Sequence, residues 1–313
     1  ALFQEEVRFR RLGLVVVDEQ HRFGVHQRLA LRQKGETERH IPHQLIMTAT
    51  PIPRTLAMTA YADLDVSVID ALPPGRTPVE TVAVPDTRRE EVVERIRHAC
   101  AGGRQAYWVC TLIEESEALE AEAAAATAAR LAEQLPELRV GLVHGRQNSA
   151  EKQEAMAAFK AGDSHLLVAT TVIEVGVDVP RASLMVIENP ERLGLAQLHQ
   201  LRGRVGRGAE RSTCVLLYHP PLSAPARERL GVLRETGDGF AIAQKDLEMR
   251  GPGEVLGTRQ TGLLQLRVAD LQRDHDLLGR VEAVGRRLLR GHPDRAAALV
   301  RRGVGDGVDY GHV

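Results

Sequence analysis

The stretch "LGLVVVDE", residues 12–19, runs from apolar side chains directly into two carboxylates. Its three consecutive valines are β-branched and favour a strand. A continuous apolar run of this kind is typical of a strand covered on both faces of a parallel sheet. Functional groups in such sheets gather beyond the carboxyl ends of the strands. We therefore predict a buried strand that delivers Asp18 and Glu19 to a site at its carboxyl end.

Short apolar runs alternate with amphipathic segments up to about residue 222, which predicts an α/β fold with a parallel sheet and helices on both faces. We expect Gly251-Pro252-Gly253 to end a helix at 240–251. The predicted strands are 12–17, 44–48, 65–69, 79–84, 105–110, 139–143, 165–169, 183–188 and 213–218. The predicted helices are 24–34, 53–62, 87–101, 116–134, 149–161, 194–202, 224–235, 240–251, 270–290 and 294–302.

The stretch "ALPPGRTP", residues 71–78, indicates a linker, because its prolines and glycine extend neither a strand nor a helix. Only three predicted strands precede it, too few for a covered sheet, and six follow it. We expect a first domain at 1–74 that is truncated at its N-terminus and a complete second domain at 75–222. A helical region at 223–302 and a flexible tail at 303–313 complete the predicted organisation.

Composition excludes several classes of protein. The 313 residues are 43% hydrophobic, enough for real cores, but only 3% aromatic, so these cores must be built from aliphatic side chains. No apolar run approaches the roughly 20 residues that span a bilayer. Cys100, Cys110 and Cys214 show neither metal-ligand spacing nor a paired framework. We expect buried thiols in a reducing compartment, the cytoplasm.

Charge is divided unevenly along the chain, although the total is −1. Residues 1–191 hold 21 basic and 28 acidic side chains, a net charge of −7. Residues 192–302 hold 20 basic and 12 acidic side chains, a net charge of +8. The basic part is consistent with phosphate or nucleic-acid binding. Arginine-rich solvated helices give the same count, so charge alone leaves both interpretations open.

Two strand ends in the first domain carry polar groups. Asp18 and Glu19 could bind Mg²⁺ and activate a water molecule, or they could simply begin a surface loop. The segment "MTATPIPRTL", residues 47–56, places Thr48 and Thr50 at the end of the next strand, where their hydroxyls could bind Glu19 or a γ-phosphate. A threonine-rich turn before a proline-started helix is the alternative.

A third block, "VATTVIEVGVDVP", residues 168–180, follows a strand of the second domain. The hydroxyls of Thr170 and Thr171, with the backbone amides beside them, are suited to a nucleic-acid phosphate. Gly176 relieves the turn, and Asp178 could accept a hydrogen bond from a ribose hydroxyl. An ordinary strand-to-helix loop, the alternative, does not require so many special residues together.

A fourth block, "QLHQLRGRVGRG", residues 197–208, contains two closely spaced arginines. Gln200, Arg204 and Arg207 recur at spacings of four and three, which would place them on one face of a helix. Guanidinium groups carry fixed charge and forked donors, so they suit phosphoryl oxygens and can act as arginine fingers. An exposed basic helix is the alternative.

In this order and spacing, the four blocks resemble the motifs of superfamily-2 helicases and translocases, in which two RecA-like domains clamp ATP and Mg²⁺. The segment "LVHGR", residues 142–146, resembles a stretch that lies towards DNA in that class, which implies DNA contacts by His144 and Arg146. The resemblance assigns Asp18–Glu19 to motif II, Thr48–Thr50 to motif III, Thr170–Asp178 to motif V and Gln200–Arg207 to motif VI.

Within this class the chain resembles the RecG family of bacterial DNA translocases nearly word for word. Residues 229–262 resemble the TRG region, a helical hairpin and loop that couples domain closure to movement along duplex DNA. The resemblance implies coupling roles for Arg229 and Gln260. Arg250, Arg259 and Gln260 flank glycine turns, from which they could reach a DNA phosphate or serve as caps and solvated side chains. The segments that carry this resemblance are "DEQHRFGV", "TATPIPRTLAM", "LPPGRTP", "TTVIEVGVDVP" and "QLHQLRGRVGRG".

The resemblance implies tandem RecA-like domains, the first truncated, followed by the TRG hairpin and a helical tail. It implies an ATP-dependent helicase or translocase that uses Mg²⁺ and remodels stalled forks and Holliday junctions in recombination and repair. It also implies a monomer that works on the nucleoid in the bacterial cytoplasm, with a contact to the single-stranded DNA-binding protein.

Two parts of the RecG pattern are missing from the sequence. No lysine follows a glycine, so the chain contains no G-x-x-x-x-G-K-[ST] phosphate loop, and it contains no wedge domain. We expect the chain to be a C-terminal portion of such a protein, without ATPase activity by itself. The related transcription-repair coupling translocase Mfd is one alternative, although "DEQH" and "HGR" favour RecG. A non-catalytic DNA-binding module is the other.

Overall fold

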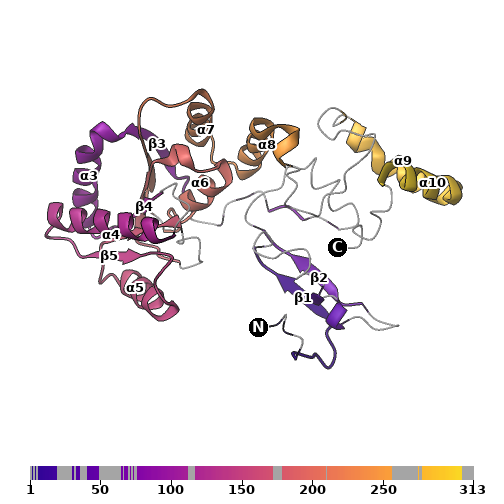
Figure 1. Ribbon diagram of the computed structural model, residues 1–313, viewed down its shortest axis with the longest axis horizontal. Coiled ribbons are helices and arrows are strands. Elements are labelled where there is room, and N and C mark those ends of the chain that lie inside the picture. Colours follow the sequence, from indigo (N-terminus) through magenta and orange to yellow (C-terminus); the bar gives the residue numbers. More distant parts are fainter. Residues whose placement is uncertain are drawn as a thin grey trace. The chain divides into compact units, whose positions relative to one another are not determined.

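The chain divides into two compact units (Figure 1). Unit 1 consists of residues 1–67 and 250–313, and unit 2 consists of residues 68–249. The computed structural model describes residues 6–19, 41–48, 76–111, 117–171, 178–208, 210–255 and 277–304, together with residues 2, 4, 30, 31, 33–35, 65, 67–69, 71, 73 and 274.

Unit 2 is built on a six-stranded parallel sheet with the strand order β3-β8-β7-β4-β6-β5. Parallel neighbours need crossover connections, which helices supply here, so the predicted α/β fold is confirmed. The strands are β3 (Glu80–Pro85), β4 (Gln105–Cys110), β5 (Val140–Val143), β6 (Leu166–Ala169), β7 (Ala182–Glu188) and β8 (Thr213–Tyr218). The helices are α3 (Arg89–Ala101), α4 (Glu117–Gln134), α5 (Ser149–Ala161), α6 (Leu195–Arg202) and α7 (Ala224–Glu235), followed by α8 (Gly239–Val255), which runs on past residue 249.

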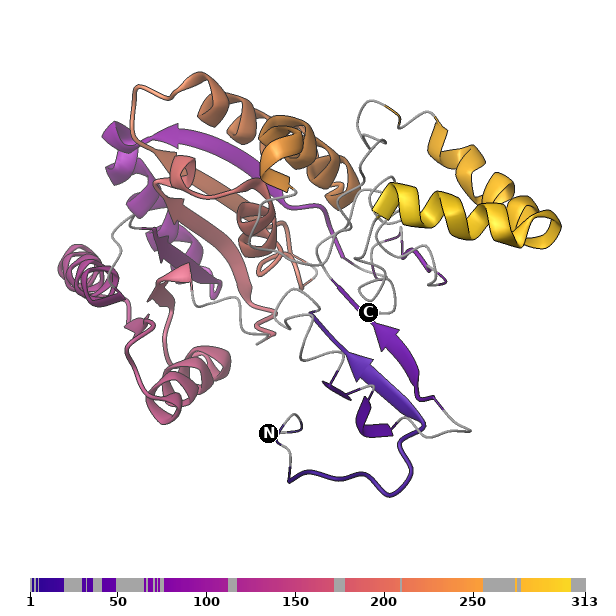
Figure 2. The ribbon, with the colours of Figure 1, turned by 45° about the vertical axis from the view of Figure 1, so that its right-hand side comes forward.

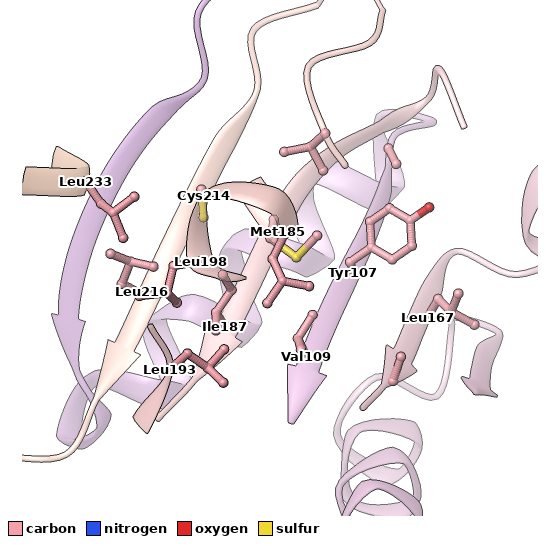
Figure 3. Packing of buried hydrophobic residues seen from close by; sticks show 14 of the residues in the cluster. Tyr107, Val109, Leu167, Met185, Ile187, Leu193, Leu198, Cys214, Leu216 and Leu233 are labelled. Atoms are coloured by element: carbon pink, nitrogen blue, oxygen red, sulfur yellow. The ribbon is translucent and has the colours of Figure 1, made fainter. Parts of the chain in front are cut away.

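Helices cover both faces of this sheet. Successive side chains of a strand point to opposite faces, so the apolar strands need packing partners on each side. In β4, Ala106 and Trp108 join a core shared with α3 and α4. Tyr107 and Val109 join the other core, shared with α5, α6 and α7, where Leu198 packs (Figure 3). All six residues of β4 are buried, as expected of a central parallel strand.

Local signals fix the ends of α5, which lies next to one of the predicted site segments. Asn148 and Glu151 form a reciprocal capping box, in which each side chain accepts the other residue's backbone N–H at 2.9 Å. Gly162 ends the helix in the left-handed conformation, with φ 90°, which glycine adopts without steric strain. The predicted helix at 149–161 is therefore confirmed.

The three cysteines lie in unit 2 and are free and buried, as predicted. Burial raises the pKa of Cys100 to about 11 and the pKa values of Cys110 and Cys214 to about 12. These thiols therefore stay protonated near neutral pH and have little nucleophilic character.

The described part of unit 1 contains a pair of parallel strands, β1 (Leu14–Val17) and β2 (His43–Ile46) (Figure 1). Val17 lies opposite Ile46, and the backbone N–H of Met47 donates to the Val17 carbonyl at 2.8 Å. The carboxyl ends of the two strands therefore lie side by side.

Only one face of β1 is buried. Val15 and Val17 pack with Leu31, whereas Leu14 is 54% exposed and Val16 is 53% exposed. The prediction that this strand is covered on both faces is therefore wrong for the described part of unit 1. The physical reason is that the described residues supply packing partners on one face only.

Two further element predictions were wrong. The described residues of the segment 65–69 form no strand, and Ile69 is 89% exposed because no described strand pairs with it. Helix α8 does not end at Gly251-Pro252-Gly253 but runs to Val255. A proline inside a helix removes one donor and strains the preceding turn, but this does not always end the helix.

The C-terminal part contains α9 (Leu278–Gly291) and α10 (Pro293–Val304), which contact each other and lie side by side (Figure 2). The predicted tail helices are confirmed here, although the first begins at Leu278 within the described residues. Among the described helices, none combines the length and the apolar character needed to cross a bilayer.

Candidate active site

The carboxyl ends of β1 and β2 place two predicted residues side by side. Asp18 follows β1 directly and is exposed, and Thr48 follows the end of β2. The Oδ1 atom of Asp18 accepts the backbone N–H of Glu19 at 2.8 Å. Glu19 has a φ of 51°, which a residue with a Cβ rarely adopts and which is often found at functional sites. Thr50 lies outside the described residues.

This pair of carboxylates fits the chemistry of Mg²⁺. The ion prefers oxygen ligands and usually takes one or two protein carboxylates, with waters or phosphate oxygens completing its shell. The described residues contain no group of three or more His, Cys, Asp or Glu that could hold a metal ion. Asp18 and Glu19 supply the one or two carboxylates that a magnesium site usually takes from a protein.

In unit 2, the two predicted arginines lie in the turn and loop that follow α6. The helix ends at Arg202, so Gln200 lies on its last turn, whereas Arg204 and Arg207 lie beyond it. The prediction that these three residues share one helix face is therefore wrong. Gly203 caps the helix, and glycine disfavours helix continuation.

The loop after α6 contacts the segment that contains Asp178. Arg207 Nη1 lies 3.5 Å from Asp178 Oδ1, and these side chains are 29% and 59% exposed. A Cβ on Gly208 would lie 2.5 Å from the Pro180 carbonyl oxygen, so only glycine permits this approach of the two backbones. The structure thus brings Asp178 and Arg207 together, while Gly176 lies outside the described residues.

Tyr107 is a buried residue whose hydroxyl feels the charges of this group, and its place there was not predicted from the sequence. Burial raises the pKa of its hydroxyl to about 12, against the opposing charges of Arg207 and Arg204, while Asp178 adds to the increase. All three charged residues are therefore close enough to act on one hydroxyl. Tyr107 was missed because it stands inside a continuous apolar run, which indicates core packing and nothing more.

Arg202 is a second residue that the sequence analysis missed. Its side chain is buried, and Nη1 donates to the carbonyl oxygens of Leu233 at 2.9 Å and Thr236 at 2.8 Å. Nη2 lies 2.8 Å from Nδ1 of His199. Burial, followed by the nearby charge of Arg202, lowers the pKa of His199 to about 4. A neutral His199 can accept from Arg202, and the guanidinium ties α6 to the end of α7.

The predicted DNA-facing residues lie at the carboxyl ends of two neighbouring strands, β5 and β6. The backbone N–H of Thr170 donates to the Val143 carbonyl at 3.2 Å, which places Thr170 beside His144 at the sheet edge. Thr170 is 2% exposed, and its hydroxyl has no hydrogen-bond partner in the described structure. Nδ1 of His144 also lacks one there. Arg146 is exposed, and Thr171 is half-buried.

The loop around His144 is rigidly organised. Gln147 Oε1 accepts the backbone N–H of His144 at 3.0 Å, and Gln147 Nε2 donates to the Leu142 carbonyl at 3.2 Å. Lys152 donates to the Gly145 carbonyl at 2.7 Å. The loop can therefore present donors for phosphate oxygens in a fixed arrangement.

The predicted coupling residues are only partly within the described structure. Arg229 lies on α7 and donates to the Glu191 carbonyl at 2.8 Å, which holds this helix against the short helix η4 (Pro190–Arg192). Arg250 lies on α8. Arg259 and Gln260 are outside the described residues.

Two family models match the chain, and both describe helicases. The model of the helicase conserved C-terminal domain matches residues 88–209. The model of domain 3, C-terminal, of the ATP-dependent DNA helicase RecG matches residues 236–299. The six-stranded sheet of unit 2 is therefore the RecA-like C-terminal domain of a helicase.

The relatives narrow this class to one family. The ATP-dependent DNA helicase RecG of Escherichia coli O157:H7 is 69% identical over 303 residues, which are 96% of this chain and 44% of the relative. That of Acidithiobacillus ferridurans is 66% identical over 313 residues, which are 100% of this chain and 45% of the relative. The solved structure of RecG bound to a three-way DNA junction is 48% identical, with a TM-score of 0.67, and the match covers 88% of this chain and 35% of that one.

The chain belongs to the RecG family. It spans less than half the length of these relatives, 44% and 45% of the two RecG sequences.

Proposed function

We propose that the protein acts as an ATP-dependent translocase on double-stranded DNA that remodels branched DNA such as stalled forks and Holliday junctions. Membership of the RecG family supports this proposal, since its relatives are named ATP-dependent DNA helicases and one was solved with a three-way DNA junction. The observation that carries it is the ion pair between Arg207 and Asp178, with Arg204 in the same loop, beside the amino ends of β3 and β7.

The proposed roles in ATP hydrolysis follow from the charges of these residues. Arg204 and Arg207 stabilise negative charge that develops on the phosphoryl oxygens, and Asp178 with Gly176 contacts the nucleotide. Glu19 orients the attacking water and, with Asp18, holds Mg²⁺, which supplies Lewis-acid neutralisation of the phosphates when bound. Thr48, Thr50 and Gln200 position these groups through hydrogen bonds.

The proposed DNA contacts lie along one edge of the sheet. The hydroxyls of Thr170 and Thr171 and the donors of His144 and Arg146 bind phosphate oxygens, which fixes the register of the protein on the duplex without reading its sequence. The buried Thr170 hydroxyl, which lacks a partner among the described residues, supports this role. Arg229, Arg250, Arg259 and Gln260 couple ATP turnover to movement along DNA.

A chimera tests this function, with the chain replacing the matching 303 residues of the Escherichia coli relative. ATP hydrolysis is measured with three-way junction DNA. We expect Arg204→Gln, Arg207→Gln and Glu19→Gln each to lower kcat, by about 10³-fold for the arginines. Arg95→Gln on the exposed face of α3 is the matched control and should leave kcat unchanged. Normal hydrolysis by either arginine variant would contradict the roles assigned here.

One observation favours a second function for the chain as it stands. The 313 residues contain no G-x-x-x-x-G-K-[ST] sequence, and this loop normally supplies most of the phosphate cradle. We therefore propose that the chain alone binds branched DNA but turns over ATP negligibly. The same hydrolysis assay on the 313-residue chain checks this, and turnover comparable to that of the chimera would exclude it.

A further inference from the structure

The segment before β3 contacts the loop that carries the two arginines. Arg76 Nε donates to the Gly206 carbonyl at 3.1 Å, and Arg76 Nη2 donates to the Gly203 carbonyl at 3.3 Å. One residue further on, the Thr77 hydroxyl donates to the Glu210 carbonyl at 3.4 Å. All these contacts lie within unit 2 and join residues that are more than a hundred positions apart in the sequence.

Each of the two carbonyls that accept from Arg76 belongs to the residue directly before one of the two arginines. Arg204 follows Gly203, and Arg207 follows Gly206. The Gly203 carbonyl also accepts Nε of Arg207 at 3.4 Å, so Arg76 and Arg207 share one acceptor. The position of each arginine's backbone therefore depends on a carbonyl that Arg76 holds.

Gly206 limits the ways in which this loop can move. It has a φ of +77°, and a Cβ built there would lie 2.6 Å from Cγ2 of Val79. The loop is therefore packed tightly against the chain that continues from Arg76 into β3. Because no space separates them, a displacement of residues 76–79 must move the loop or break the hydrogen bonds of Arg76.

We propose that Arg76 is a positioning residue for Arg204 and Arg207, so that the segment before β3 sets the geometry of the cationic side of the site. This inference rests on the proposed function. The guanidinium suits the task because its planar fork donates to two acceptors in a fixed geometry, which a lysine ammonium does not reproduce. A shift of about 1 Å in a reacting arrangement can lower a rate by about 10²-fold.

Steady-state ATP hydrolysis by the chimera tests the proposal with Arg76→Gln and Arg76→Lys. We expect both variants to lower kcat by about 10- to 100-fold and to change KM for ATP less than about threefold, since the catalytic groups remain but are misplaced. The Arg95→Gln control should match the parent. Far-UV circular dichroism of each purified chimera variant, compared with that of the parent chimera, reports whether the variant is folded.

A triple variant separates this proposal from the proposed function. In a background with both Arg204→Gln and Arg207→Gln, Arg76→Gln should lower kcat no further, because both groups that it positions are gone. Suppose that Arg207→Gln is inactive, while folded Arg76→Gln or folded Arg76→Lys has the kcat of the parent chimera. The positioning role is then wrong and the proposed function stands. If Arg207→Gln hydrolyses ATP normally, the proposed function fails and the positioning role fails with it.

Discussion

The carboxylates of unit 1 and the arginines of unit 2 follow elements that differ in how completely they are buried. Asp18 follows a strand on which Val15 is buried but Val16 is 53% exposed. Arg204 follows a helix whose residues Leu195 and Leu198 are 0% and 1% exposed in the core beneath the sheet. Within the described residues, the strand that leads to the acids is therefore packed on one face only. The sheet of unit 2, to which the arginine loop belongs, is packed on both faces.

This difference teaches how each group of charges is held. In unit 1 the local backbone holds the acids, through the left-handed φ of 51° at Glu19 and the hydrogen bond from its N–H to Asp18. In unit 2, hydrogen bonds between distant segments hold the arginine loop and its helix. Substitutions in the buried contacts of unit 2 should therefore have large effects, and those on the open face of β1 should have small ones.

The largest expected effect on stability comes from Arg202. We expect Arg202→Met to lower the free energy of unfolding of unit 2 by about 3 kcal/mol, because it leaves the carbonyls of Leu233 and Thr236 without their charged donor. Urea unfolding followed by Trp108 fluorescence measures this, since Trp108 lies only in unit 2.

The control for this experiment is Arg234→Met, at an exposed position near the end of α7. It removes the same charge from an exposed side chain on α7, the helix whose end Arg202 contacts, and we expect a change within about 0.5 kcal/mol. Equal effects of the two substitutions would show that the bond between α6 and α7 does not stabilise the unit.

The sequence was most informative where the pattern of apolar residues was clear. The run "QAYWVC" predicted β4 at 105–110, and the amphipathic segment 149–161 predicted α5. The structure then places Thr170 beside His144, because the parallel strands β5 and β6 end at a common edge. Edge positions follow from topology, which the alternation of elements predicts well.

The sequence was less informative about the position of individual arginines. Arg202 continues the buried stripe of Leu195 and Leu198 at helical spacing, and this signal could have identified it as buried. The bonds from Arg76 to the loop could not have been predicted, because nothing local indicates a contact over this sequence separation. The end of α6 at Arg202, which is capped by Gly203, also depends on the observed backbone.

Acid should weaken unit 2 through His199. The pKa of this residue is lowered from 6.5 to about 4, first by burial and then by the charge of Arg202, with Asp238 opposing. Between these two values the unfolded chain binds a proton that the folded chain does not, so stability falls as the pH drops. From pH 7 to pH 5 we expect a loss of about 2 kcal/mol from this residue.

The measurement for this pH dependence is urea unfolding at pH 7 and pH 5, followed by Trp108 fluorescence, for the parent and His199→Gln. The difference in stability between the two proteins should change by about 2 kcal/mol across this range. Glutamine keeps an acceptor for Arg202 but does not titrate. Parallel pH profiles for the two proteins would mean that His199 is not held neutral in the folded state.

The smallest expected effect compares two valines that sit on the two scaffolds. Val186 in β7 is 0% exposed, so Val186→Thr buries a hydroxyl, and we expect a loss of about 1.5 kcal/mol by Trp108 fluorescence. Val16 in β1 is 53% exposed. Hydrogen exchange of the β2 amides measures the free energy of opening of this strand pair, and Val16→Thr should change it by less than about 0.5 kcal/mol. Should Val16→Thr instead cost more than about 1 kcal/mol, this face of β1 would have to be covered in solution. The carboxylates would then stand on a scaffold as closed as that of the arginines.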